Sequence, residues 1–183
     1  MLTGLNVDTG KNIQLGAGAI LKTKYVAGTQ LTPENILSAT NGGMTIAIVP
    51  EYFTPSIDGS FDNTKGTGKT IVRYTVTLSF TAVETDAEVL MKALGCADVT
   101  DGVITGRHTI KAEDYSDLYA IGERGDGSII QFTIKNAMNT SGLSLVTANN
   151  GNGGIAFTIS GNYDVNDLNT PPFEIEEIVP AGE

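Results

Sequence analysis

The stretch from Thr70 to Gly95 constrains the fold more than any other, because a long strand pattern leads directly into a helix pattern. Between Val72 and Phe80, apolar and polar residues alternate strictly, and most of them are β-branched or aromatic. Such alternation over so many residues predicts a long β-strand with one buried face. The residues expected on that face are Val72, Tyr74, Val76, Leu78 and Phe80.

After this strand the apolar spacing changes to that of an amphipathic helix, over about residues 86–94. Thr85 and Glu88 have the spacing of a capping box, in which side chains bind backbone N–H groups at the helix start. Gly95 can adopt the left-handed conformation that ends many helices. The residues expected on the buried face are Ala87, Leu90, Met91 and Leu94. We find no second helix pattern of this quality.

Most of the remaining chain has the pattern of short strands separated by turns. Many of the 22 glycines cluster with Asn, Asp and Ser between apolar runs, and Asn41-Gly42-Gly43 is one such turn signal. Asp126-Gly127 between two alternating runs predicts a hairpin. Strands are expected over residues 11–22, 43–50, 102–110, 117–124, 127–135, 142–146 and 154–160. The predicted fold is a single domain over residues 1–183, mainly β, forming an antiparallel β-sandwich or partly closed barrel with one flanking α-helix.

Residues 51–70 form an unusually long connection between two predicted strands. Large apolar residues in a projecting segment need a partner surface, so one interpretation is contact with a neighbouring molecule. The other interpretation is that they fold back onto the chain's own sheet. The residues expected to make the contact are Tyr52, Phe53, Ile57, Phe61, Lys65 and Lys69.

The chain carries a net charge of −10, and no Lys or Arg follows Lys135. An acidic surface repels phosphate, so tight binding of nucleic acid is disfavoured. The single cysteine and single histidine exclude a disulfide framework and a zinc cluster built from several such ligands. The N-terminus lacks the layout of a signal peptide, and no apolar run approaches the length of a membrane-spanning helix, so no membrane partner is expected.

Two short motifs have simpler explanations than the functions they suggest. Gly66-Thr67-Gly68-Lys69-Thr70 resembles the end of a phosphate-binding loop, but Asn63 occupies the place of the first glycine and a strand follows where a helix is required. Arg124-Gly125-Asp126 spells a cell-adhesion tripeptide, but the hairpin turn explains it. With no catalytic constellation in the sequence, we expect neither enzymatic activity nor a cofactor or metal.

Five segments in the same order resemble the tail tube (major tail) proteins of tailed bacteriophages that infect Gram-positive bacteria. The first three are NIQLGAGAILK, LSATNGGMTIAIVPEY with the following SIDG, and LMKALGCADVT. The last two are IQFTIKNAMNTSGLSL and DLNTPPFEI. The resemblance runs from about residue 12 to residue 176 and depends on the collinear set, because no single segment is specific.

This resemblance implies a subunit of the virion tail that is assembled in the cytoplasm of the bacterial host. Such subunits form rings, usually of six, whose inner strands join into one barrel, and the rings stack into a tube through which genomic DNA passes without specific binding. Loop 51–70 and a C-terminal arm from about residue 168 would contact the next ring. The arm residues implied are Pro171, Pro172 and Phe173. Other expected partners are the tape measure, terminator and distal tail proteins.

A second hypothesis is a β-sandwich module that binds a cell-surface ligand such as carbohydrate. An exposed aromatic platform would favour it, but the chain has no Trp and only 7% aromatic residues. Within the first hypothesis, a long flexible tail, a contractile tail and a bacteriocin-like particle all remain open.

Overall fold

Six antiparallel strands close into a barrel in the computed structural model, which describes residues 11, 14–56, 58, 68–149, 151 and 153–179. The barrel strands are β1 (Gln14–Leu21), β2 (Ile36–Phe53), β3 (Thr70–Ala82), β6 (Ser116–Arg124), β7 (Ile129–Asn139) and β9 (Gly154–Gly161). They lie in the order β7-β6-β1-β2-β3-β9, and pairing of β7 with β9 closes the ring. Two further strands, β10 (Phe173–Ile178) and β8 (Leu145–Val146), add to β7 and β9 respectively. The predicted mainly β fold with one helix is confirmed.

The core lies inside this barrel, where alternate residues of each strand meet. Phe80 and Phe157 are direct partners in the β3–β9 ladder, and their rings stack with centroids 4.9 Å apart. The predicted inward residues of β9 are all buried, as is the second half of the predicted face of β3. The largest members of the core are Ile20, Leu37, Val76, Leu78, Phe80, Val89, Leu118, Ile134, Ile155, Phe157 and Ile159.

Helix α1 (Ala87–Leu94) flanks the barrel and contacts β2, β7 and β9. The predicted capping box is wrong by one residue, because Asp86 is the N-cap and its Oδ1 accepts a hydrogen bond from the Val89 amide at 2.9 Å. A carboxylate there is also favoured by the helix dipole. The buried face is rotated as well: Val89 and Ala93 are fully buried, whereas the predicted face residues are exposed or half-buried. Gly95 ends the helix with φ 80°, as expected.

Strand β2 is longer than predicted, because Asn41-Gly42-Gly43 forms a bulge inside the strand instead of a turn before it. Thr40 pairs with Ala82 and Met44 pairs with Phe80, so the three residues between them face a single residue of β3. Gly42 and Gly43 have φ values of 79° and 82°, which cost glycine little.

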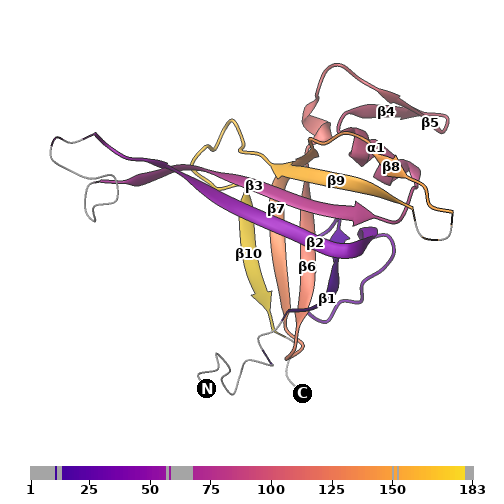
Figure 1. Ribbon diagram of the computed structural model, residues 1–183, viewed down its shortest axis with the longest axis horizontal. Coiled ribbons are helices and arrows are strands. Elements are labelled where there is room, and N and C mark those ends of the chain that lie inside the picture. The colour runs from indigo at the N-terminus through magenta and orange to yellow at the C-terminus, as the bar shows by residue number, and fades with distance from the viewer. Residues whose placement is uncertain are drawn as a thin grey trace.

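A small hairpin, β4 (Ala97–Thr100) and β5 (Val103–Gly106), lies beside α1 at one end of the barrel (Figure 1). Arg107 follows β5 and joins this hairpin to the short 3-10 helix η1 (Ala112–Asp114). Its guanidinium lies 2.9 Å from the carboxylate of Asp98 and 2.5 Å from that of Asp114. The Arg107 and Asp114 side chains are only 14% and 6% exposed, so this ion pair is largely shielded from water.

Candidate assembly surfaces

The ends of β2 and β3 leave the barrel together as a two-stranded ribbon, drawn at the left of Figure 1. We define the ribbon as residues 49–53 of β2 and 70–75 of β3. The β3–β9 ladder begins only at Val76, so the first six residues of β3 pair with β2 alone. The ribbon therefore extends past the core that its strands help to form.

Apolar side chains continue along the ribbon beyond the buried core. Five are between 45% and 64% exposed: Val49, Tyr52, Phe53, Ile71 and Val72. The prediction that Val72 is buried is wrong, because the strand pattern continues beyond the core and Val72 is 64% exposed. Several large apolar side chains exposed on a projecting element indicate a contact site for another molecule.

The far end of the ribbon brings together three of the residues predicted to make contacts. The Lys69 ammonium lies 4.5 Å from the centroid of the Tyr52 ring, a cation–π geometry, and Phe53 pairs with Thr70. Nearby, Glu51 and Arg73 are direct strand partners and form an ion pair. The predicted loop 51–70 therefore begins as strand. The other three predicted contact residues, Ile57, Phe61 and Lys65, lie outside the described residues.

Strand β2 also presents an open backbone edge. Its ladder with β1 ends where Ala19 pairs with Ala39, and from Met44 to Phe53 its described pairing is with β3 alone. Unpaired strand edges can add a strand from another molecule, so such edges favour association. Residues 44–50 of this edge carry no charged side chain that would oppose pairing.

The segment predicted as a C-terminal arm adds an acidic strand to the chain's own sheet. Pro172 is buried, and Phe173 at the start of β10 packs edge-on against Tyr74 with ring centroids 5.2 Å apart. Pro171 is half-buried beside them. The part predicted for these three residues in a contact between copies stays a prediction.

Three ion pairs attach β10 to neighbouring elements. They are Lys135–Glu174 at 2.5 Å, Lys24–Glu176 at 2.7 Å and Arg124–Glu177. The hydrogen bond from Lys135 lowers the pKa of Glu174, and the hydrogen bond to Glu176 raises the pKa of Lys24. Both shifts favour the ionised form of the side chain at neutral pH. The edge strand β10 is therefore acidic, and its carboxylates are paired with cations.

A polar cleft of about 580 Å³ is the best candidate for the carbohydrate site of the second hypothesis. It is lined by Tyr115, Asn136, Asn162 and Tyr163 together with Asp164 and Asn166. Several of these polar groups already have partners inside the chain. The amides of Asn136 and Asn162 bind backbone carbonyls, and the Tyr163 hydroxyl accepts the Tyr74 amide at 2.7 Å. The cleft therefore has few free donors with which to hold a sugar.

The described part of the chain contains no group of three or more His, Cys, Asp and Glu residues that could hold a metal ion. Thr70 begins a strand, so no helix N-terminus follows the Gly-Lys-Thr sequence that suggested a phosphate site. None of the described helices is long and apolar enough to cross a lipid bilayer.

Sequence reasoning missed the exposed apolar residues of the ribbon outside the predicted loop, namely Val49, Ile71 and Val72. A signal for them is present in the strand lengths. The strand pattern over residues 70–82 is far longer than the pattern over residues 154–160, and a strand that outlasts its partner must extend beyond the shared core.

No protein-family model matches the chain, and no curated protein matches it. Among solved structures, one similar chain belongs to the virion of a native gene transfer agent particle. The two chains are 13% identical with a TM-score of 0.43, and the match covers 81% of this chain and 92% of the other. At this degree of likeness the function has to be argued from the residues of the chain itself.

Proposed function

We propose that this chain is the structural subunit of a phage or prophage-derived tail tube, which self-assembles into six-membered rings that stack around a channel. The observation that carries the proposal is the projecting ribbon, with five exposed apolar side chains beside an open β2 edge. A single subunit leaves this surface in water, whereas a neighbouring subunit would cover it. In this proposal the role of the chain is structural and not catalytic.

Assembly would relieve two unfavourable features of the lone subunit. Pairing of the β2 edge with a neighbour would satisfy backbone groups that water now solvates. Burial of the ribbon side chains would contribute roughly 25 cal/mol for each Å² of apolar surface removed from water. A contact between the ribbon and a different surface of the next copy would be heterologous, and heterologous contacts build rings or open stacks.

The charge of the chain is compatible with a channel for DNA. A net charge of −10 for each subunit gives a ring an acidic character, which repels the phosphate backbone and keeps it from binding to the wall. DNA would therefore pass without specific contacts. The proposal places the chain in the virion tail, after assembly in the bacterial cytoplasm, with tape measure, terminator and distal tail proteins as further partners.

Sedimentation velocity over a range of protein concentrations, with negative-stain microscopy of the fastest fraction, tests the proposal. We expect rings or tubes with a central channel, and a rise in their fraction with concentration. A matched variant, Phe53→Ser with Val72→Ser, should stay monomeric at the same concentration and keep the melting temperature of the subunit. Purely monomeric wild-type protein at high concentration would argue against a tube subunit. Binding to a glycan array by that monomer would favour the carbohydrate module.

A further inference from the structure

An apolar groove of about 230 Å³ lies beside β1 on the barrel. We call it the glycine groove, and its main lining residues are Gly18, Leu31, Ile121, Gly122, Glu123 and Ile129. Three glycines, Gly16, Gly18 and Gly122, are among the residues that line it. A cavity of about 150 Å³ is enough to hold a benzene ring, so the glycine groove has room for one aromatic side chain.

The groove results from a bulge in β1. Leu15 pairs with Glu123 and Ala19 pairs with Ile121, so residues 16–18 of β1 lie opposite Gly122 alone. A Cβ atom on Gly18 would lie 2.4 Å from the carbonyl oxygen of Ile121, and the residue has φ 74°. The local backbone therefore requires glycine here, and the hollow is built into the fold.

Among the described residues, Glu123 is the one charged residue that lines the groove. Its side chain is exposed and forms no ion pair with any residue that the structure describes. The next residue, Arg124, is paired instead with Glu177. The groove therefore combines an apolar floor with one carboxylate that has no described partner. It would suit an aromatic side chain that has a cationic side chain next to it.

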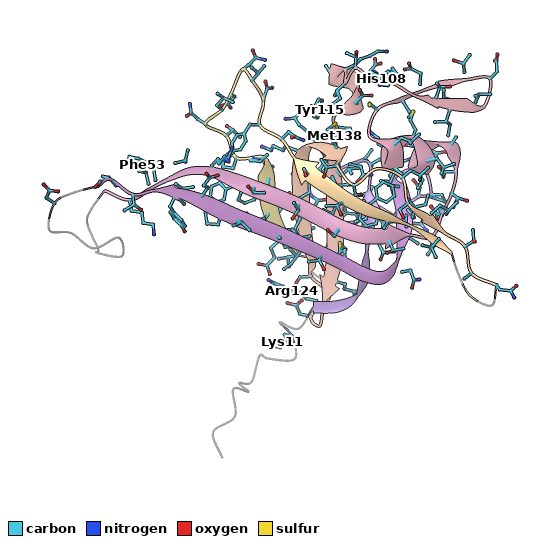
Figure 2. The ribbon with its side chains drawn as sticks, turned by 45° about the horizontal axis from the view of Figure 1, so that its top comes forward. Lys11, Phe53, His108, Tyr115, Arg124 and Met138 are labelled. Atoms are coloured by element: carbon cyan, nitrogen blue, oxygen red, sulfur yellow. The ribbon has the colours of Figure 1, made fainter. Side chains whose placement is uncertain are left out.

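The end of the ribbon has these features. Tyr52 is 51% exposed, and the ammonium of Lys69 lies over its ring at 4.5 Å. Lys69 forms no ion pair with a described residue. Figure 2 places Phe53, next to Tyr52, far from Arg124, next to Glu123. The ribbon of one molecule therefore cannot reach its own groove.

We propose that the glycine groove of one subunit receives Tyr52 of a second copy, with Lys69, directly before the ribbon's second strand, paired to Glu123 at the groove. This inference rests on the proposed self-assembly and names the surface that accepts the ribbon. The contact joins two different surfaces of the same chain. Each added copy therefore presents a new free ribbon or a new free groove, and the contact can repeat from copy to copy.

Charge reversal tests the ion pair at the centre of this contact. Lys69→Glu and Glu123→Lys each place like charges together, and each should raise the critical concentration for assembly about tenfold. The double variant restores opposite charges and should assemble at nearly the wild-type concentration. An equimolar mixture of the two single variants should also assemble, because contacts between unlike variants then bring opposite charges together. Glu84→Lys, an exposed charge reversal away from the groove and ribbon, is the control and should assemble normally.

Disulfide trapping provides a second measurement. In a Cys96→Ser background, Tyr52→Cys combined with Leu31→Cys should give a ladder of covalent multimers under oxidising conditions. The same ribbon variant combined with Val146→Cys should give none.

The outcomes separate this inference from the proposed function. Failure of the wild-type protein to assemble would overturn both. Normal assembly of both single charge variants, or the absence of a disulfide ladder from protein that forms tubes, would leave the tube proposal standing. Either result would overturn the inference.

Discussion

Asn136 and Asn162 each donate a hydrogen bond from the side-chain amide to the backbone carbonyl of the other, at 3.1 and 2.8 Å. This reciprocal pair lies where β7 exchanges partners. Before Asn136, β7 pairs with β10, and after it β7 pairs with β9. Asn136 adopts φ 47°, a left-handed conformation that turns the strand at this corner of the barrel. The pair therefore holds the corner at which the barrel closes.

Replacing Asn162 by Ala should lower the free energy of unfolding by about 1–3 kcal/mol, because two carbonyl groups lose a donor. Those carbonyls belong to Asn136 and Ser160. Urea denaturation measures the change, and Asn166→Ala in an exposed loop is the control. An effect no larger than that of the control would show that the pair does not hold the corner.

The conformation of Asn136 gives a separate prediction. Asn136→Gly and Asn136→Ala remove the same hydrogen bonds, but only alanine is strained at φ 47°. The alanine variant should therefore be less stable than the glycine variant by about 1 kcal/mol. Equal stabilities in urea denaturation would contradict this account of the corner.

Gly16 and Gly18 in β1 form a matched pair for testing the glycine groove. Both have φ near 75°, but a Cβ on Gly16 would meet nothing within 4 Å, whereas one on Gly18 would clash with Met44 and Ile121. Gly16→Ala should cost about 1–2 kcal/mol for backbone strain. Gly18→Ala should cost a further 1–3 kcal/mol for overpacking. Similar stabilities for the two variants would mean that the bulge adjusts freely.

Much of the barrel could be predicted from the sequence, because strand periodicity records which side chains face the core. The alternating run in β9 and the Asp126-Gly127 turn between β6 and β7 lie where expected. Predictions from turn-forming residues were less reliable where the same residue types favour two different local conformations. Gly42 and Gly43 suit a turn and a bulge equally well, and only pairing with β3 selects the bulge.

The candidate site was harder to predict, since exposure depends on where the core ends. Val72 and Val76 belong to the same alternating run, yet one is 64% exposed and the other 1% exposed. The difference depends on the end of β9, far away in the sequence. The glycine groove likewise depends on contacts of β1 with β6 that are long-range and leave no local pattern.

Val89 and Phe53 should separate folding from assembly. Val89, on the buried face of α1, is fully buried, so Val89→Ala should lower the free energy of unfolding by roughly 1–3 kcal/mol. Phe53 is 57% exposed, so Phe53→Ser should leave the melting temperature of the subunit almost unchanged and weaken assembly. Calorimetry and sedimentation measure the two effects. A fall in melting temperature for Phe53→Ser as large as that for Val89→Ala would place Phe53 in the core.

The Arg107–Asp114 ion pair should make the β4–β5 hairpin sensitive to acid. Burial alone would raise the pKa of Asp114, but the Lys111 amide and the Arg107 guanidinium together lower it below its ordinary value. A carboxylate with a lowered folded-state pKa stabilises the fold above its unfolded pKa of about 3.9, and this contribution is lost as pH falls through the folded value. The amides of β4 and β5 should therefore be protected against hydrogen exchange at pH 5 and above, compared with their intrinsic exchange rates. This protection should be lost below about pH 4.

Asp114→Asn is the matched variant for this prediction, because it keeps the shape of the side chain and removes its charge. The variant should show weak protection of the hairpin at pH 7, comparable to that of the wild-type protein in acid, and little further change on acidification. Protection of β9, a central strand of the barrel, is the internal control and should stay high in both proteins over the same pH range. Hairpin protection that falls equally with acid in the variant would place the sensitive group elsewhere.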